Sequence, residues 1–291
     1  MLTIAYTGFD RFLLDRAFFD NTGIYNVNLL SSTPTSIVVE NPSNFIQTTL
    51  TGSGFTFDLT GTPTGGTVTS MSFEENGLQG TITGMNWSLV ALDAALTAVT
   101  PVDTSPFDAL FDMQRIKIDA SGGENGVTVD AAARTKKLVF VGSADTDFVV
   151  SGAANDKLSG GKGGDMIAGG AGADIISGGR GGDALEGGGG RDKILGGSGR
   201  DMISGGGGRD QISGGLGNDL LDGGTQADTF VFDVARNEGR DWILDFQDGV
   251  DMIALAGGTA TDITSIAASA SGTDTIVTLA SGTEIHLKGV D

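Results

Sequence analysis

A nine-residue repeat in the second half of the chain constrains its fold more than any other feature. Seven copies follow one another without a break from Gly160 to Asp222, reading GGKGGDMIA, GGAGADIIS, GGRGGDALE, GGGGRDKIL, GGSGRDMIS, GGGGRDQIS and GGLGNDLLD. Glycine occupies positions 1, 2 and 4 of every copy, aspartate occupies position 6, and Ile or Leu occupies position 8. Chance does not hold such a register over seven copies, so each copy is a structural unit.

Degenerate copies extend this register on both sides of the block. Asp147 and Asp156 continue the nine-residue spacing upstream, and Asp228 continues it downstream. The position-6 residues are therefore ten aspartates at strict spacing: Asp147, Asp156, Asp165, Asp174, Asp183, Asp192, Asp201, Asp210, Asp219 and Asp228. The three outer copies lack part of the glycine pattern, so for these the alternative of an acidic turn without a metal stays open.

Each copy predicts one turn and one short strand. From position 6 onward the copy reads D-x-U-x, where U is apolar, and this alternation is typical of a strand. The glycine-rich half permits the positive φ angles that tight turns need. A single copy buries nothing, but stacked copies form a parallel β-helix with position 8 inside and position 7 outside.

The residues of the turns predict calcium sites. Aspartate oxygens beside backbone carbonyls form an all-oxygen site, and calcium accepts 6–8 such ligands in flexible geometry, whereas magnesium demands a stricter octahedron. Ion binding is expected to drive folding, because a glycine-rich block cannot otherwise offset roughly 1–2 kcal/mol of backbone entropy per residue. Besides the aspartates, the expected sites include the glycines at positions 2 and 4: Gly161, Gly163, Gly170, Gly172, Gly179, Gly181, Gly188, Gly190, Gly197, Gly199, Gly206, Gly208, Gly215 and Gly217.

The repeat GGxGxDxUx resembles that of the RTX proteins, which bacterial type I exporters secrete. The resemblance implies a right-handed parallel β-roll in which two copies make one turn. It also implies that aspartates 18 residues apart, such as Asp165 with Asp183 or Asp174 with Asp192, share a calcium ion. Ten aspartates allow at most eight such pairs, so up to about eight ions are expected.

The same resemblance bears on localisation. Segments 227–232 and 240–255 resemble the segment that caps RTX rolls. In that family the export signal lies near the C-terminus and is not cleaved. The resemblance therefore implies a secreted, extracellular protein that uses the type I secretion apparatus, and cell-surface association is a further expectation.

Arginine stands at position 5 of three copies, as Arg191, Arg200 and Arg209, where many RTX repeats carry Asn, Asp or Gly. A guanidinium group near the ion edge would oppose calcium, although only the backbone carbonyl need coordinate there. We therefore expect weaker or fewer occupied sites than in an acid-rich roll.

The predicted fold class is mainly β, in four segments. Residues 1–115 form a small β-rich (α+β) domain of unknown target, and residues 116–140 form a bridging segment. The calcium-binding roll occupies 141–232, and a capping β region with the secretion signal occupies 233–291. Within these segments, strands are expected at 35–40, 54–60, 66–73 and 78–85, helices at 10–19 and 88–99, and a terminal hairpin at 274–290.

The outward side chains at position 7 differ between the two predicted sheets. On one sheet they are all apolar, namely Phe148, Met166, Ala184, Met202 and Leu220; on the other they are Lys157, Ile175, Lys193, Gln211 and Thr229. A patterned apolar face is ordinarily buried. We therefore expect either residues 1–115 or another molecule to cover it.

Charge and missing residue types disfavour several functions. A net charge of −20 disfavours nucleic acid and anionic lipid as partners. The chain has no cysteine and one histidine, His286, and it contains neither HExxH nor GxSxG. No apolar run reaches the ~18 residues of a membrane span, and the first residues do not resemble a cleaved signal peptide. No catalytic residue and no organic cofactor are expected, and His286 is expected to be a solvated strand residue.

Together these features predict a secreted calcium-binding protein that folds on meeting calcium outside the cell. A structural or surface-interaction role in a surface layer, matrix or adhesion is expected, through self-association or binding of cell-surface polysaccharide. The alternative is a secreted enzyme or effector that acts on polysaccharide through an atypical N-terminal domain.

Overall fold

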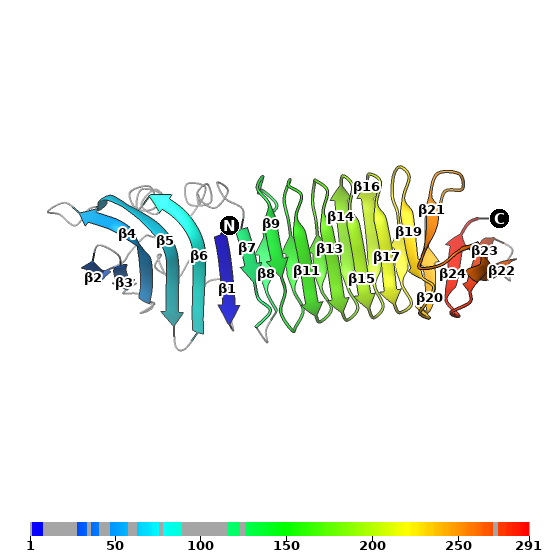
Figure 1. Cartoon of the computed structure of the whole chain (residues 1–291), viewed down its shortest axis with the longest axis horizontal. Helices are drawn as coiled ribbons and strands as arrows, with labels where there is room; N and C mark the ends of the chain where they lie inside the picture. Colours follow the sequence, from blue (N-terminus) through cyan, green and yellow to red (C-terminus); the bar gives the residue numbers. More distant parts are fainter. Residues whose placement is uncertain are drawn as a thin grey trace. The chain divides into compact units, whose positions relative to one another are not determined.

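The computed structural model (Figure 1) describes residues 2–7, 28–33, 36–40, 47–57, 63–75, 78–88, 116–122, 126–269 and 273–290. The described secondary structure is β apart from one short 3-10 helix, Ala260–Asp262. None of the helical structure in these ranges is long and apolar enough to cross a membrane. The chain divides into two compact units, Met1–Asn125 and Gly126–Asp291.

The first unit contains an antiparallel sheet. Its strands are β1 (Leu2–Thr7), β2 (Asn28–Thr33), β3 (Ser36–Glu40), β4 (Gln47–Phe57), β5 (Pro63–Glu75), β6 (Leu78–Ser88) and β7 (Ile116–Asp119). Strands β2 to β6 pair antiparallel in chain order, and β1 pairs antiparallel with β6 and parallel with β7. The strands predicted at 66–73 and 78–85 are confirmed within β5 and β6, and those predicted at 35–40 and 54–60 are confirmed over 36–40 and 54–57, the part of each that the structure describes. The two predicted helices fall outside the described residues, except for Ser88, which ends β6.

The second unit contains two parallel sheets that form a β-roll (Figure 1). The first roll sheet consists of β8 (Thr128–Asp130), β10 (Phe148–Val150), β12 (Met166–Ala168), β14 (Ala184–Gly189), β16 (Met202–Gly207), β18 (Leu220–Asp222) and β20 (Arg240–Ile243). The second roll sheet consists of β9 (Leu138–Val141), β11 (Lys157–Lys162), β13 (Ile175–Arg180), β15 (Lys193–Ser198), β17 (Gln211–Leu216), β19 (Thr229–Asp233) and β21 (Met252–Ala256).

The register of these sheets confirms two nonapeptides per coil. Consecutive strands along the chain alternate between the sheets, and facing residues such as Met166 and Ala184, or Ile175 and Lys193, are one coil apart. The ladders extend beyond residues 141–232, because β8 and β9 pair with β10 and β11, and β20 and β21 pair with β18 and β19. These outer strands keep the alternating half of the repeat without its GGxG half, so the nine-residue period did not reveal them.

Position 8 fills the interior of the roll, as predicted. These side chains are at most 3% exposed, and burying each one contributes roughly 1.5–3 kcal/mol. The column comprises Val149, Leu158, Ile167, Ile176, Leu185, Ile194, Ile203, Ile212, Leu221 and Phe230, and Phe140 and Ile243 extend it at its two ends.

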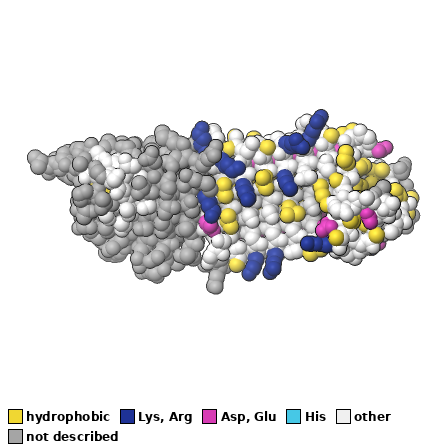
Figure 2. Space-filling view, in the orientation of Figure 1, with side chains coloured by type: hydrophobic (Ala, Val, Ile, Leu, Met, Phe, Trp, Pro, Cys, Tyr) yellow, Lys and Arg dark blue, Asp and Glu magenta, His cyan; other side chains and the backbone are white. Residues whose placement is uncertain are grey.

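The outward side chains of the first roll sheet form an apolar stripe, consisting of Phe148, Met166, Ala184, Met202 and Leu220. Phe148, Met166 and Met202 are 46%, 51% and 60% exposed. The described residues thus leave the stripe open, and its cover by residues 1–115 or by another molecule stays a prediction. Figure 2 shows Lys and Arg side chains and hydrophobic side chains distributed along the roll, with few acidic side chains on the visible face.

The C-terminal strands continue the first roll sheet. β24 (Glu284–Lys288) pairs parallel with β20 and antiparallel with β23 (Asp274–Leu279), which pairs antiparallel with β22 (Ile263–Ala268). The predicted terminal hairpin is confirmed. The expectation that His286 is solvated was wrong: its strand lies between two others, and the side chain is 7% exposed and packs against Trp242.

Candidate calcium sites

The ten position-6 aspartates lie at the bends of the coils, each immediately before an outward position-7 residue. All ten are at most 2% exposed. They form two rows, one made by Asp147, Asp165, Asp183, Asp201 and Asp219 and the other by Asp156, Asp174, Asp192, Asp210 and Asp228. Burial of a carboxylate is unfavourable unless the group is paired, so the partners of these oxygens decide what the turns can bind.

One oxygen of each carboxylate has a backbone partner in the preceding coil. The N–H group of Asp165 donates to Asp183 Oδ1 at 2.8 Å, and that of Asp174 donates to Asp192 Oδ1 at 2.7 Å. The same bond recurs along both rows. The structure therefore brings together the aspartates 18 residues apart that the RTX resemblance pairs.

The second oxygen of eight aspartates is buried without any hydrogen-bond partner. These atoms are Oδ2 of Asp165, Asp174, Asp183, Asp192, Asp201, Asp210, Asp219 and Asp228. Each faces the position-1 glycine of its own turn; a Cβ added to Gly178, for example, would lie 2.2 Å from Asp183 Oδ2. A buried carboxylate oxygen without a partner is strongly unfavourable, so the residues present fit a bound cation.

The glycines at positions 2 and 4 let successive turns stack closely. Gly179 and Gly181 have φ angles of 117° and 124°, and an added Cβ would lie 2.2 and 1.7 Å from the carbonyl oxygens of Gly161 and Gly163. All fourteen glycines expected at the sites have φ between 90° and 157°. An L side chain would be strained there and would strike the neighbouring coil. The pattern GGxG thus crowds backbone carbonyls next to the carboxylates.

Burial also changes the proton affinity of the carboxylates. It raises the pKa of Asp165 to about 6 and that of Asp174 and Asp201 to about 7, against the opposing effect of the backbone N–H bonds. The neighbouring aspartates in each row add to the rise. A cation at the turns would favour the ionised form and reverse this effect.

Asp147 and Asp156 lie in the first coil that carries row aspartates, made by β10 and β11 and called the first coil from this point, and they differ from the rest. Asp147 Oδ2 accepts the N–H of Ser143 at 2.8 Å, and its Oδ1 accepts the Ser143 hydroxyl at 3.0 Å. Asp156 Oδ2 accepts the hydroxyl of Ser151. The alternative of an acidic turn without a metal therefore suits Asp147 and Asp156, whereas Asp228 has the same unpartnered oxygen as the central aspartates.

Two further aspartates continue the rows outside the nine-residue period, which did not reveal them. Asp219 N–H donates to Asp241 Oδ1 at 2.9 Å, and Asp228 N–H donates to Asp251 Oδ1 at 3.0 Å. Asp241 is fully buried, its Oδ2 has no partner, and burial raises its pKa to about 8. The spacings of 22 and 23 residues break the period. The surviving signal was the pattern D-x-U, as in Asp241-Trp242-Ile243.

The donor set is compatible with calcium. In the part of the chain that the structure describes, no three acidic or histidine side chains converge on one point. A cation at the turns must therefore take most of its ligands from the stacked backbone carbonyls. Carbonyl and carboxylate oxygens in a flexible arrangement suit calcium better than magnesium, and they do not suit metals that prefer sulfur or nitrogen.

Comparisons with known proteins identify the family of the repeats. The RTX calcium-binding nonapeptide repeat matches in four copies, at residues 141–176, 159–194, 168–203 and 195–230. Among solved structures, the AlgE6R3 subunit of the Azotobacter vinelandii mannuronan C5-epimerase is 34% identical, over 38% of this chain and 73% of that one, with a TM-score of 0.31. The extracellular lipase LipA of Serratia marcescens is 17% identical, over 71% of this chain and 49% of the lipase, with a TM-score of 0.24. No curated protein matches the chain.

Both TM-scores are low, so neither superposition assigns a function. The repeat match is specific, because it covers the turns in which glycines pack against carbonyl oxygens of the neighbouring coil. In the same turns the aspartate Oδ2 atoms have no hydrogen-bond partner. RTX repeats bind Ca²⁺, and their family implies secretion. Through residues 141–230, this chain belongs to the RTX family of calcium-binding nonapeptide repeat proteins.

Proposed function

We propose that this protein is secreted unfolded or loosely folded, that its roll folds by taking up calcium outside the cell, and that the folded roll has a structural or surface-interaction role. The observation that carries the proposal is the row of buried aspartate oxygens without partners. These oxygens make the folded roll unfavourable without a cation and favourable with one. Free calcium is low inside a cell, so the chain would stay loose until export.

The ions would be held between successive turns of one row. Each site would use carboxylates one coil apart, such as those of Asp165 and Asp183, together with carbonyls of the glycine turns. The calcium ion would neutralise carboxylates that otherwise repel one another along the row. The chain supplies the remaining order, because the N–H···Oδ1 bonds fix each carboxylate relative to the preceding coil.

Calcium binding and folding would be one process. The turns have little side-chain volume, so the interior column alone competes with the entropy of a glycine-rich backbone. A ligand that binds only the folded chain stabilises it by mass action, and several ions in one stack stabilise it cooperatively. A steep calcium dependence of folding is therefore expected.

The apolar stripe supports a role in interaction. Phe148, Met166 and Met202 line a hollow of about 620 Å³ on the first roll sheet, together with Leu220 and Leu244. Exposed apolar surface of this continuity is typical of interaction sites. A surface layer, a matrix or an adhesive contact would use such a face.

Circular dichroism with chelator, then calcium, then magnesium tests the folding proposal. Strand signal that requires calcium and is poorly restored by magnesium supports it; a spectrum indifferent to calcium contradicts it. Size-exclusion chromatography and electron microscopy with and without calcium test the role. Ordered calcium-dependent assemblies support a structural role, whereas a calcium-requiring monomer with hydrolase or lyase activity on polysaccharide would support the enzyme alternative.

A further inference from the structure

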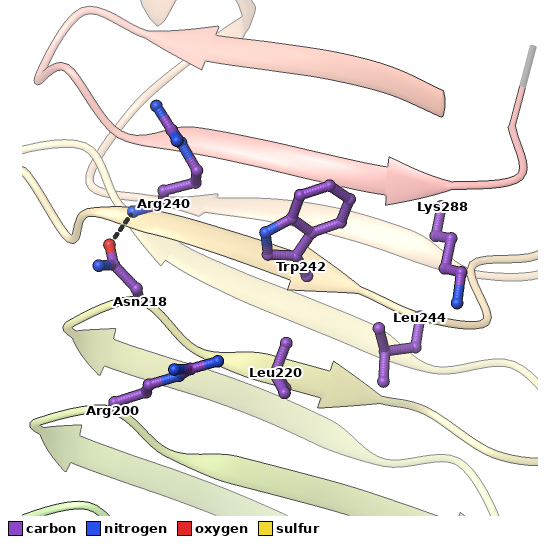
Figure 3. Close-up of a pocket in the computed structure, with 7 residues that line it drawn as sticks. All are labelled: Arg200, Asn218, Leu220, Arg240, Trp242, Leu244 and Lys288. Carbon is purple, nitrogen blue, oxygen red and sulfur yellow. Dashed lines mark hydrogen bonds between the residues drawn. The ribbon is translucent and has the colours of Figure 1, made fainter. Parts of the chain in front are cut away.

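A hollow of about 450 Å³ lies on the first roll sheet where the roll meets the C-terminal strands (Figure 3). Its lining residues are Arg200, Asn218, Leu220, Arg240, Trp242, Leu244 and Lys288. Three of these side chains are cationic, and none is acidic, although the whole chain carries a net charge of −20. The sequence repeat does not account for this pocket, since two of its cations and its only aromatic ring lie beyond the last complete copy.

The indole ring of Trp242 is held in a fixed position on the first roll sheet, as a platform for a ligand ring. It occupies the outward ladder position of β20, between Leu220 of β18 and His286 of β24. The His286 ring packs against the indole with 4.4 Å between ring centroids. His286 is buried and Trp242 is half-buried, so the histidine supports the indole from within the sheet and leaves part of the ring available.

The cations lie on two sides of this platform. Figure 3 shows Arg200 and Arg240 toward one end of the pocket, Lys288 toward the other, and Trp242 between them. Arg240 Nε donates to Glu284 Oε2 at 2.8 Å, and its backbone N–H donates to Asn218 Oδ1 at 2.9 Å. Among the described charged groups, none forms an ion pair with Arg200 or Lys288, so these two are available to a ligand.

We infer that this pocket binds an acidic polysaccharide, a polymer of uronic acids, with one sugar ring on Trp242 and carboxylates at Arg200 and Lys288. A pyranose ring has flat C–H faces that suit an indole and the adjoining leucines, and a polar rim that reaches cations and an amide. Arginine forms directed, paired hydrogen bonds with carboxylates. This inference deepens the surface-interaction role proposed above and rests on it.

The charge pattern disfavours the other polyanions. Duplex DNA carries one charge per ~1.7 Å of its axis, and a protein binds it by neutralising many phosphates at once. Three cations spread around one aromatic ring match a sparser polymer with one carboxylate per sugar. An acidic peptide such as polyglutamate has no flat ring to stack on Trp242.

A second pocket provides a matched control. On the second roll sheet, a hollow of about 430 Å³ also contains three cations, Arg191, Lys193 and Arg209. It has no aromatic ring, and three aspartates of the calcium row line it. Arg200 and Arg209 both occupy position 5 of a repeat, immediately before a row aspartate, so the two replacements fall at the same place in their turns.

The experiment uses the full chain with Trp87→Phe, which leaves Trp242 as the only indole of the two in the sequence. A short oligogalacturonate of defined length is titrated at one fixed calcium concentration, after circular dichroism has shown that each variant is folded. A saturable change in Trp242 fluorescence is expected. Arg200→Gln with Lys288→Gln should weaken binding about tenfold, the sum of two exposed ion pairs. Arg209→Gln with Lys193→Gln should leave the affinity within about twofold, because these two residues line the pocket on the second roll sheet. Association of calcium with the uronate is common to all samples and does not distinguish the variants.

Several results would overturn the inference: no oligogalacturonate binding, equal weakening by the two double variants, or equal binding of the methyl-esterified oligomer. Polyglutamate binding as tight as that of the uronate, and unaffected by Trp242→Leu, would assign the pocket to acidic peptides instead. If Trp242→Leu does not fold, the charge variants decide alone. A chain that folds with calcium but binds no uronate removes only this inference, whereas a chain that ignores calcium removes the proposed function.

Discussion

The first coil of the roll and the coils after it satisfy the same buried carboxylate in two different ways. In the first coil Ser143 and Ser151 provide hydrogen bonds to Asp147 and Asp156. One coil later, glycine stands at the equivalent positions, 161 and 169, and the second carboxylate oxygen has no partner. The turns that contain serine supply hydrogen-bond donors to both carboxylates, whereas the glycine turns leave the aspartate Oδ2 atom without a donor.

If calcium drives folding as proposed, this difference predicts that the need for calcium depends on the turn and not on the aspartate alone. All ten aspartates are equally buried and make the same N–H···Oδ1 bond or its equivalent. The difference lies at the other oxygen, Oδ2: at Asp156 it accepts the Ser151 hydroxyl, and at Asp147 it accepts the backbone N–H of Ser143. We therefore expect the first coil to form without calcium at its carboxylates and to offer an edge on which later coils stack as calcium binds.

Removal of calcium should have the largest effect and should separate the two regions. In excess chelator, backbone amides of the coils from Asp165 to Asp228 should lose most of their protection from hydrogen exchange, since the buried Oδ2 atom of each carboxylate then has no partner. Amides of 128–158 should keep more of theirs. Hydrogen exchange followed by mass spectrometry measures both at once, and uniform loss along the whole roll would contradict the comparison.

The pH dependence without calcium should follow from the raised pKa values. The pKa values of Asp165, Asp174 and Asp201 rise from 3.8 to about 6, 7 and 7 in the folded roll. Between about pH 4 and about pH 7 the folded chain thus binds more protons than the unfolded chain. Protonation of these carboxylates therefore stabilises the folded roll fully below about pH 4, and this stabilisation is lost as pH rises through about 7.

Thermal unfolding by circular dichroism at about pH 5 and about pH 8 measures this, because those values lie on either side of the folded pKa range. In chelator the roll should be more stable at the lower pH. In calcium the order should reverse, because protons compete with the ion for the same oxygens. A chelated roll that is more stable at the higher pH would show that these carboxylates are not the groups that oppose folding.

Single aspartate replacements compare the two regions directly. Asp183→Ala removes a carboxylate from the middle of one row and should raise the calcium midpoint of folding about tenfold, as expected for loss of one strong charged contact. Asp147→Ala in the first coil should shift it by less than about twofold, because Ser143 already serves that carboxylate. Calcium titration followed by circular dichroism gives both midpoints, and equal shifts would argue against a cooperative stack.

Much of the roll was predictable because its repeat encodes it locally. The alternation D-x-U placed Ile176 inside and Ile175 outside, and GGxG specified turns in which Gly179 and Gly181 have positive φ. The period could not reveal Asp241, because extra residues between coils break the spacing while the fold still aligns the strand. Nor could it predict the burial of His286, which depends on strand β24 pairing with β20.

The sequence could not predict the role of the serine turns for a further reason. A hydroxyl reaches the carboxylate only once the turn has formed, so in the sequence Ser151 is only a departure from the glycine pattern.

Ser151→Gly tests the role of this hydroxyl. In chelator it should destabilise the roll by about 1–3 kcal/mol, because Asp156 Oδ2 loses its donor. Calcium should restore that loss, as the turn then matches the central ones. Ser159→Gly, at a strand position away from the carboxylates, controls for added backbone freedom. Thermal unfolding with and without calcium measures the difference, and a loss that calcium does not repair would mean that the glycine turn alone does not create an ion site.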